Sequence, residues 1–306
     1  MEIIRGLENI REKKNSVITL GTFDGLHIGH KKIIDKVVEV AENKGLQSVL
    51  LTFEPHPRLV LNSSDKPIRL LSTIDEKVEI LRSFKLDVVV VINFSKEFAD
   101  KSYKDFVKSI LINRLNLKHL VLGYDHHFGK NREGNFDSLK KMEQEYSFSI
   151  DKVDPLYIND ELVSSSLIRD YLLNGDVSSA SVYLQRPYKI EGIVVKGAGR
   201  GKILSFPTAN IKITTQHKII PGNGVYAVDV ELKSLRYKGM MNIGYRPTFS
   251  DSNHTIEVHI FGLNDNIYNE NLTVYFKKRL RGEIKFSSRE ELIKQLETDK
   301  KESLHL

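Results

Sequence analysis

The pattern of apolar residues changes character near the middle of the chain. In the first half, β-branched runs without polar alternation are separated by segments whose apolar residues recur at the spacing of one helix face. This pattern predicts strands at 16–20, 48–53, 87–94 and 119–123, a helix containing Ile33 to Ala41, and helices at 74–84 and 103–115. Such alternation predicts a Rossmann-like α/β domain, a parallel sheet with helices on both faces. The loops after its strands should open at one edge, where such sheets bind ligands.

Thr73 and Glu76 form a capping box at the start of the helix predicted at 74–84. Two short helices are expected later, from about Ser164 to Asn174 and through Val182.

From Tyr188 onward, runs of strand composition are split by Gly, Pro, Asn and Asp, which predicts a small antiparallel barrel or sandwich. The runs lie at 188–197, 209–213, 224–232, 236–244, 255–261 and 271–276. A charged helix is expected from about Ser288. We place the domain boundary so that residues 1–183 form the first domain and residues 184–306 the second.

Composition and charge argue against secreted and membrane proteins. The chain has 306 residues, no cysteine, 40% hydrophobic and 28% charged residues, and its first residues lack the apolar core of a secretory signal. No run of 18 apolar residues could span a bilayer, so a cytoplasmic protein without membrane contact is expected. The formal net charge of +6 suits an anionic partner. Lys and Arg are spread along the chain without a zinc-finger or RNA-binding signature, which favours phosphorylated small molecules over nucleic acid. Oligomeric state is left open.

The first candidate site is the loop LGTFDGLHIGH, residues 20–30. His27 and His30 are three residues apart and project from one side of a helix's first turn. The free N–H groups and positive dipole end of that turn favour phosphate, and Gly21 and Gly25 let a phosphate chain approach the backbone. Imidazole donors suit phosphoryl or nucleotidyl transfer. Two surface histidines, or a zinc site with further ligands from elsewhere, are the alternatives.

Within this loop, His-Ile-Gly-His resembles the HxGH signature of nucleotidyltransferases, and GTFDGLHIGH resembles its form in prokaryotic FAD synthetases. TFEPHP at 52–57, GYDHHFG at 123–129 and VSSSLIR at 163–169 match that family in order. The resemblance implies that His27 and His30 hold the ATP phosphates and stabilise the transition state, with Arg169 as a further catalytic residue. The ATP-binding residues it implies are Gly21, Phe23, Asp24, Gly25, His27, His30, Asp125, Ser165 and Arg169.

The same resemblance implies that the flavin lies near Phe53, Pro55 and Pro57, although a proline-stiffened loop would also explain that stretch. One residue departs from the family pattern. His126 follows Asp125 where relatives usually carry an aromatic residue, which leaves the adenine or flavin contact of this loop open.

The second candidate site lies in KGAGRGKILSFPTANIKI, residues 196–213, and in TIEVHIF, residues 255–261. Thr208 and Asn210 are two apart on an incoming strand, so they face one side, and their oxygens suit a Mg²⁺ that also binds phosphates and water. Glu257 and His259 alternate with aliphatic residues, and Glu257 could accept the proton of an attacking alcohol. Turn chemistry, a flexible glycine loop and a solvent-facing strand are the alternatives.

The order FPTAN, GVYAV, NIGYRPTF, EVHIF and LRGEIKF closely resembles riboflavin kinase. The resemblance assigns Thr208 and Asn210 to Mg-ATP and Glu257 to the general base. It implies that a flap over ATP contains Gly197, Gly199, Arg200 and Gly201. It also implies that Arg281 and Phe286 border the flavin. Ser205 stands where the family commonly has glycine.

Together the two resemblances imply a bifunctional enzyme that uses ATP and Mg²⁺ to convert riboflavin to FMN and FMN to FAD. Two alternatives remain. Another HxGH nucleotidyltransferase with an accessory barrel should lack Pro-Thr-Ala-Asn and the downstream glutamate. A flavin- or nucleic-acid-binding regulator should show lost catalytic residues or clustered basic runs. The sequence contains Pro-Thr-Ala-Asn and the downstream glutamate, and it shows neither lost catalytic residues nor clustered basic runs.

Overall fold

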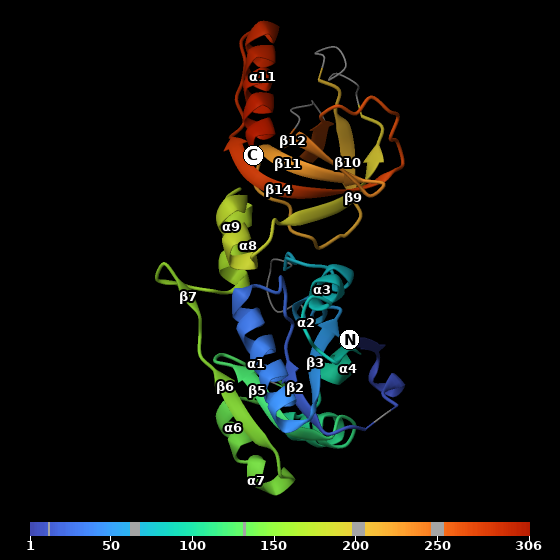
Figure 1. The fold of residues 1–306 in the computed structure, drawn as a ribbon, viewed down its shortest axis with the longest axis vertical. Helices are drawn as coiled ribbons and strands as arrows, with labels where there is room; N and C mark the ends of the chain where they lie inside the picture. The colour runs from blue at the N-terminus through green and yellow to red at the C-terminus, as the bar shows by residue number, and fades with distance from the viewer. Residues whose placement is uncertain (12, 62–67, 131–132, 198–205, 246–253) are drawn as a thin grey trace. The chain divides into compact units, whose positions relative to one another are not determined.

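The computed structural model describes residues 1–306 apart from 12, 62–67, 131–132, 198–205 and 246–253. Contacts between residues divide the chain into two compact units, Met1–Ser165 and Ser166–Leu306 (Figure 1). Among the described residues, no helix has the length and apolar character needed to cross a membrane.

A six-stranded sheet with the order β1-β4-β3-β2-β5-β6 forms the centre of the first unit. Its strands are β1 (Glu2–Arg5), β2 (Ser16–Leu20), β3 (Gln47–Glu54), β4 (Val88–Asn93), β5 (Leu117–Gly123) and β6 (Ser149–Val153). Every neighbouring pair is parallel, so the loops that follow the strands open at one edge, as the sequence predicts. All five residues of β2, SVITL, are buried, as expected of a central strand covered on both faces.

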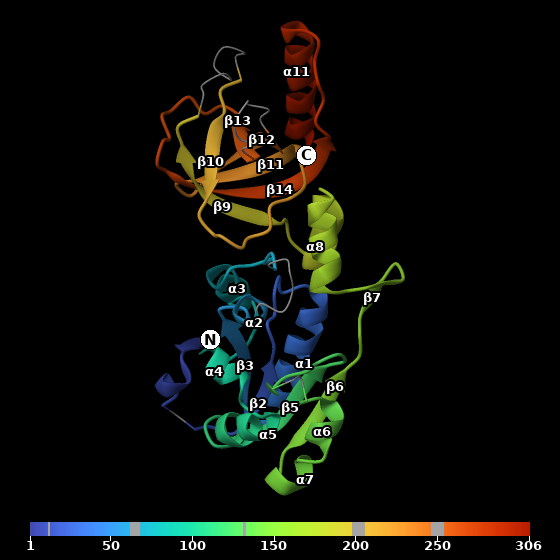
Figure 2. The ribbon, with the colours of Figure 1, turned by 180° about the vertical axis from the view of Figure 1, so that it is seen from behind.

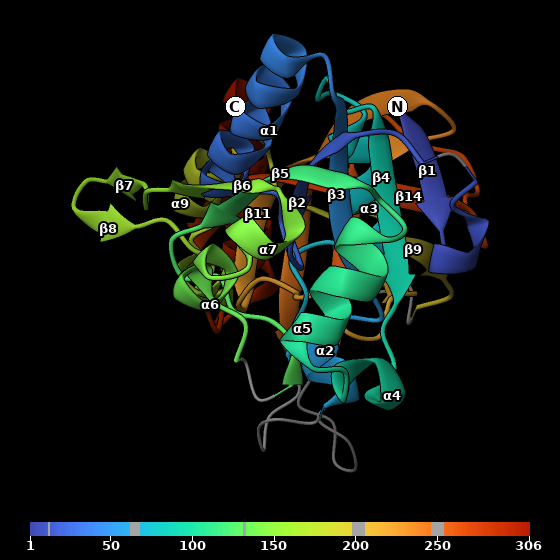
Figure 3. The same ribbon diagram turned by 90° about the horizontal axis from the view of Figure 1, so that it is seen from below.

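Helices cover both faces of this sheet. On one face, α1 (Ile28–Lys44) and α3 (Ile74–Leu81) contribute Ile34, Val37 and Leu81 to a buried cluster. The other face is covered by α5 (Tyr103–Phe106), the π-helical segment η2 (Val107–Ile112), α6 (Phe136–Lys140) and α7 (Glu143–Tyr146). Figure 3 shows α1 and α5 on opposite sides of the strands. The remaining elements are η1 (Leu7–Asn9), α2 (Pro57–Val60), α4 (Lys96–Ala99) and the hairpin of β7 (Tyr157–Ile158) and β8 (Glu161–Leu162).

The predicted α/β pattern is confirmed, although helices α2, α4, α6 and α7, η1 and the hairpin of β7 and β8 were not predicted. Helix α3 ends at Leu81 rather than at 84, and the helix expected at 103–115 is divided into α5 and η2. Strands β1 and β6 were not predicted, and they are the two edges of the sheet. Edge strands are only partly buried, so their sequences, EIIR and SIDKV, lack the continuous apolar run of the central strands. The capping box is present, because Thr73 Oγ1 accepts from the Glu76 N–H and the Glu76 carboxylate accepts from the Thr73 N–H.

Helix α8 (Ser165–Leu173) begins at the last residue of the first unit. It is followed by α9 (Val177–Leu184) and by the closed antiparallel barrel of the second unit (Figures 1 and 2). Its strands are β9 (Lys189–Val195), β10 (Ala209–Ile213), β11 (Gly224–Leu232), β12 (Leu235–Tyr245), β13 (His254–Ile260) and β14 (Asn271–Arg281). They follow the order β10-β13-β12-β11-β14-β9, and the pairing of β9 with β10 closes the ring. The predicted strands are confirmed, and the structure selects the barrel over the sandwich.

The barrel is filled by one set of alternating side chains. Tyr226, Val258 and Phe276 are completely buried, and aromatic side chains of this size fill a small barrel without leaving a channel. Side chains at the intervening positions lie on the outer face, which includes position 257. Helix α11 (Arg289–His305), capped by Ser288, packs against β11 and β12.

Candidate functional site

The first candidate site lies where the strand order of the parallel sheet reverses. β2 lies between β3, the next strand in the chain, and β5, which comes later. In open α/β sheets the crevice beyond the carboxyl ends of the strands at such a point is the usual ligand site. The loop at 21–27 follows β2, and the turn at residues 124–125 follows β5. The HxGH loop therefore lies at the position expected of a small-molecule site.

The two histidines of this loop contact each other. His27 is the N-cap of α1, and its Nδ1 accepts a hydrogen bond from the His30 N–H at 3.3 Å. Because Nδ1 is the acceptor, the proton of the neutral ring is on Nε2. The rings of His27 and His30 stack with centroids 3.6 Å apart, and Phe23 packs edge-on against His30 at 5.2 Å. At Gly29, a Cβ would lie 3.2 Å from the His27 ring, so glycine makes room for this stack.

The backbone of the loop has an unusual conformation. Gly25 has φ 79°, which glycine adopts readily, but Phe23 at 46° and Leu26 at 41° also have positive φ. For a bulky residue this region is costly and persists only where the surroundings impose it. The Phe23 and Leu26 side chains are each 3% exposed, so the hydrophobic core holds both of them. Gly21 packs against the same Phe23 ring, where a Cβ would lie 3.2 Å from it.

Asp24 is only 2% exposed and binds backbone rather than facing an open site. Its carboxylate accepts hydrogen bonds from the N–H groups of Leu71 and Ser72 at 3.0 Å, and the Gly25 N–H donates to Ser72 Oγ at 3.0 Å. These bonds anchor the loop to the segment before α3. The resemblance implies that Asp24 binds ATP, and in the structure its carboxylate holds the loop in shape.

Ser165 lies beside the same loop. Its Oγ donates a 3.0 Å hydrogen bond to the carbonyl oxygen of Asp24. The structure therefore brings together Ser165 and the HxGH loop, 141 residues apart in the chain. Arg169 follows one helical turn later on α8, within the second compact unit.

The other residues implied for the first site have different surroundings. Asp125 is exposed in the turn after β5, and His126 follows it. Phe53 is 9% exposed and belongs to the hydrophobic core, where it packs edge-on against Phe94. Pro55 lies between β3 and α2, Pro57 is the first residue of α2, and both are partly exposed. Of the three proposed flavin neighbours, only the prolines present substantial surface.

Lys77 was missed by sequence reasoning. It lies on α3, is 4% exposed, and donates to the Thr22 carbonyl at 2.7 Å and to Thr52 Oγ1 at 3.2 Å. Burial lowers the pKa of Lys77, while the neighbouring carboxylates of Asp24 and Glu54 oppose that shift. Helical spacing was the available signal, because position 77 falls on the face of Ile74, Val78 and Leu81.

The second candidate site lies on the outer face of the barrel. Thr208 Oγ1 donates to the Glu257 carboxylate at 3.0 Å. Asn210 on β10 pairs directly with Glu257 on β13. A Cβ at Gly197 would collide with the Asn210 amide, so glycine is required there. The structure thus joins four residues that the sequence placed in one site. Gly199, Arg200, Gly201 and Ser205 lie outside the described residues.

His259, two residues after Glu257, is 7% exposed. Its Nδ1 lies 2.7 Å from the Pro207 carbonyl oxygen, and its ring contacts Phe206 and Phe261 edge-on. A ring nitrogen beside a carbonyl must donate, which fixes the proton on Nδ1. Burial lowers the pKa of His259. His259 therefore holds the segment that carries Thr208.

Arg281 is bound to helix α11. Its guanidinium group makes bonds of 2.8 to 3.2 Å to the Asp299 carboxylate, and it lies over the Phe286 ring at 5.7 Å from the centroid. Asp299 also accepts from Gln295. The two residues implied to border the flavin therefore contact each other, and the charge of Arg281 is balanced by a buried carboxylate.

Within the described ranges, no group of three or more His, Cys, Asp or Glu residues could hold a metal ion. Thr208 Oγ1 and the Glu257 carboxylate lie 3.0 Å apart, and Asn210 is the strand partner of Glu257. Mg²⁺ prefers oxygen ligands and usually keeps waters and phosphates in its shell, so this set fits a Mg²⁺ bound together with a nucleotide.

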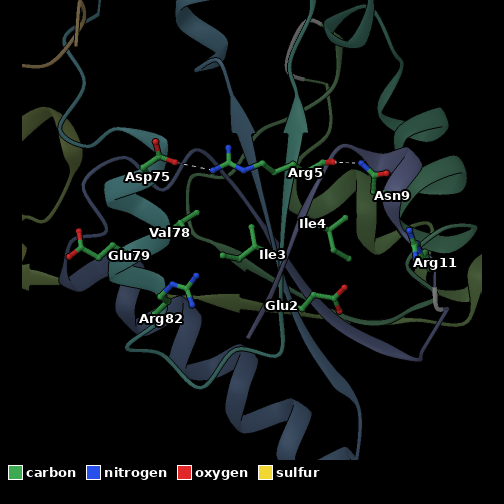
Figure 4. A pocket seen from close by; sticks show the side chains of 10 residues that line it. All are labelled: Glu2, Ile3, Ile4, Arg5, Asn9, Arg11, Asp75, Val78, Glu79 and Arg82. Atoms are coloured by element: carbon green, nitrogen blue, oxygen red, sulfur yellow. Dashed lines mark hydrogen bonds and ion pairs between the residues drawn. The ribbon is translucent and has the colours of Figure 1, made fainter. Parts of the chain in front are cut away.

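A pocket of about 770 Å³ also lies beside the edge strand β1 (Figure 4). The Arg5–Asp75 ion pair, 2.9 Å long, lies at its margin, and Ile3, Ile4 and Val78 supply apolar surface. None of the residues implied for either site lines this pocket.

Two family models match the chain. One, described as FAD synthetase, matches residues 9–167, and the other, described as Riboflavin kinase, matches residues 184–306. The bifunctional riboflavin kinase/FMN adenylyltransferase of Bacillus subtilis (strain 168) is 38% identical over 296 residues, which cover 96% of this chain and 93% of the relative. The protein of the same name from Buchnera aphidicola subsp. Acyrthosiphon pisum is 37% identical over 303 residues, 98% of this chain and 96% of the relative.

A crystal structure from Streptococcus pneumoniae, described as a macrolide-efflux protein, aligns with 100% of both chains at a TM-score of 0.89 and 29% identity. The likeness extends through both units of the chain. The two family models and the full-length relatives agree with the order of motifs in the sequence. The chain belongs to the family of bifunctional riboflavin kinase/FMN adenylyltransferases.

Proposed function

We infer that the chain makes FAD from riboflavin in two ATP-dependent steps, one in each half. The 184–306 half transfers the γ-phosphate of ATP to the 5′-hydroxyl of riboflavin, which gives FMN and ADP. The 1–183 half transfers AMP from a second ATP to the FMN phosphate, which gives FAD and pyrophosphate. The family supports both steps. The observation that carries the assignment is the presence of two separate polar groups, His27 with His30 and Thr208 with Glu257.

Adenylyl transfer suits the chemistry of the first group. An oxygen of the FMN phosphate attacks the α-phosphorus of ATP, and the bond to the β-phosphate oxygen breaks. The attacking group is already ionised, so the step needs charge stabilisation and alignment rather than a strong base. We assign those roles to N–H donors of His27 and His30, the amino end of α1, Ser165 and Arg169, with Asp125 binding the nucleotide. The stacked rings and the Ser165 bond support this assignment.

Phosphorylation of an alcohol makes a different demand, because the hydroxyl must lose a proton as its oxygen attacks the γ-phosphorus. We assign that proton to Glu257, whose carboxylate is partly exposed on the outer face of the barrel. Mg²⁺, held by Thr208 and Asn210, would neutralise phosphate charge. The Thr208–Glu257 hydrogen bond supports a common site for base and metal ligands.

The remaining assignments are extensions of this proposal. Phe53, Pro55 and Pro57 would lie near the flavin of the first step, and Arg281 and Phe286 near the flavin of the second. Gly197 and its neighbours would cover ATP during phosphorylation. The functional boundary is proposed at 183/184, and the protein is proposed to work in the cytoplasm on small molecules, without nucleic acid or membrane partners.

One incubation tests the proposal. The purified chain is mixed with riboflavin, ATP and Mg²⁺, and riboflavin, FMN and FAD are separated by chromatography over time. We expect FMN to appear first and FAD to follow. Formation of FMN without FAD would contradict the role of the first half. If riboflavin stays unchanged while added FMN is converted to FAD, the role of the second half is contradicted.

A further inference from the structure

Lys77 buries its amino group next to the first site. Transfer of an ammonium group from water into a protein interior costs several kcal/mol unless the group is paired and hydrogen-bonded. Its helix, α3, presents Asp75, Val78 and Glu79 to the pocket of Figure 4, whereas Lys77 points inward and is 4% exposed. The cost of burying Lys77 must therefore be offset by the contacts that it makes inside the unit.

Those contacts join three elements. The Nζ atom donates to the carbonyl of Thr22, in the loop after β2, and to Oγ1 of Thr52, near the end of β3. Thr52 Oγ1 donates to the same Thr22 carbonyl at 3.2 Å. The three groups form a closed hydrogen-bonded triangle between α3, the HxGH loop and the end of β3, where TFEPHP begins. The carboxylates of Asp24 and Glu54 are close enough to favour the charged form of Lys77.

Asp24 makes the reciprocal connection. It extends from the loop to the backbone N–H groups of Leu71 and Ser72, while Lys77 extends from α3 back to the loop. Residues of opposite charge thus fix both sides of Phe23, whose positive φ has to be imposed by its surroundings. His30 packs against the Phe23 ring, so the position of the catalytic pair depends on this backbone.

We propose that Lys77 is a positioning residue for adenylyl transfer: it holds the HxGH loop and the end of β3 in the arrangement that receives the phosphates of ATP. The inference rests on the proposed function of the first half. The ammonium group acts through the Thr22 carbonyl and also adds positive charge behind a site for anions. Lys77 contributes to binding and alignment without touching the reacting atoms.

The test compares Lys77→Met with Lys85→Met in the full chain. Methionine keeps the unbranched shape of lysine as far as Cε but lacks the charged, hydrogen-bonding amino group, and Lys85 is an exposed control just after α3. FAD formation from FMN is measured against ATP concentration, and riboflavin phosphorylation in the same preparation serves as the control for folding. We expect Lys77→Met to lower kcat about 10- to 100-fold, as small misplacements in active sites do, and to raise the KM for ATP. Riboflavin phosphorylation and the Lys85→Met protein should match the wild type.

Thr52→Val removes one partner of the ammonium group at nearly constant volume and covers the case in which Lys77→Met fails to fold. We expect an intermediate loss of adenylylation, and Lys77→Arg, which keeps the charge, should recover part of the activity lost in Lys77→Met. A folded Lys77→Met protein with wild-type kcat and KM would overturn the inference. If Lys77→Met does not fold, wild-type FAD formation by Thr52→Val would overturn it instead. If the wild type itself makes no FAD, the proposed function fails instead.

Discussion

The two candidate sites are built in different ways. In the first unit, the polar groups lie on a loop whose conformation is imposed by residues far away in the sequence, among them Leu71, Ser72 and Lys77. In the second unit, Asn210 and Glu257 are placed by strand register, because β10 and β13 pair them directly. A loop site therefore depends on its supports, whereas a strand site depends on the barrel's own hydrogen-bonded ladder.

This difference decides what each substitution should do. A change at a distant support should disturb the first site without unfolding its sheet. A change in the barrel should act either at a catalytic side chain or on the stability of the whole second unit. The two activities of one chain make the comparison direct, because each serves as the control for the other.

The largest expected effect is that of Glu257→Gln. Glutamine keeps the shape of the side chain but cannot accept a proton, so riboflavin phosphorylation should fall by about 10² to 10⁴. Initial rates of FMN formation measure the loss. FAD formation from added FMN should stay at the wild-type rate. An unchanged kinase rate would exclude Glu257 as the base.

The next effect concerns stability. The Arg281–Asp299 pair has side-chain exposures of 15% and 3%, so Asp299→Ala leaves a largely buried guanidinium without its partner. Loss of one member of such a pair costs about 3–5 kcal/mol, which thermal or urea unfolding of the second unit would detect.

Glu302→Ala is the matched control for that change. Glu302 pairs with Lys278 on the same helix and barrel, but both side chains are exposed, by 43% and 51%. The control should cost at most about 1 kcal/mol. Equal destabilisation by both substitutions would show that burial of the Arg281–Asp299 pair has no special role.

His27→Ala or His30→Ala should lower FAD formation about 10²- to 10³-fold, the range found when one donor to a developing charge is removed. His27→Ala also removes the cap of α1, so a thermal melt should accompany the rate measurement. Riboflavin phosphorylation should stay near the wild-type rate. Wild-type FAD formation by either folded protein would contradict the assignment.

The smallest effect is a pH dependence in the second unit. Burial lowers the pKa of His259 in the folded chain, so below the ordinary histidine pKa of about 6.5 the unfolded chain binds a proton more readily. The contribution of His259 to stability is therefore complete above about pH 6.5 and is lost as the pH falls toward the folded-state pKa. Urea unfolding between pH 5 and 8 should show a flatter profile for His259→Asn than for the wild type. Parallel profiles would count against this role.

Sequence reasoning found what periodicity and motifs encode. Alternation in TIEVHIF placed Glu257 opposite the aliphatic face, and β-branched runs without polar alternation gave the central strands of the sheet. The edge strands β1 and β6 were missed because partial burial weakens their pattern. The hydrogen-bond partners of Lys77 and the backbone contacts of Asp24 join residues 25 to 55 positions apart, and local pattern does not contain such tertiary contacts.

The central claim is that two separate sites carry the two steps. In the most direct test, the Glu257→Gln and His30→Ala proteins are each incubated with ATP, Mg²⁺ and either riboflavin or FMN. Riboflavin, FMN and FAD are then separated by chromatography. Glu257→Gln should leave riboflavin unchanged but convert FMN to FAD, and His30→Ala should convert riboflavin to FMN and stop. A folded variant in which both conversions fall together would contradict the claim.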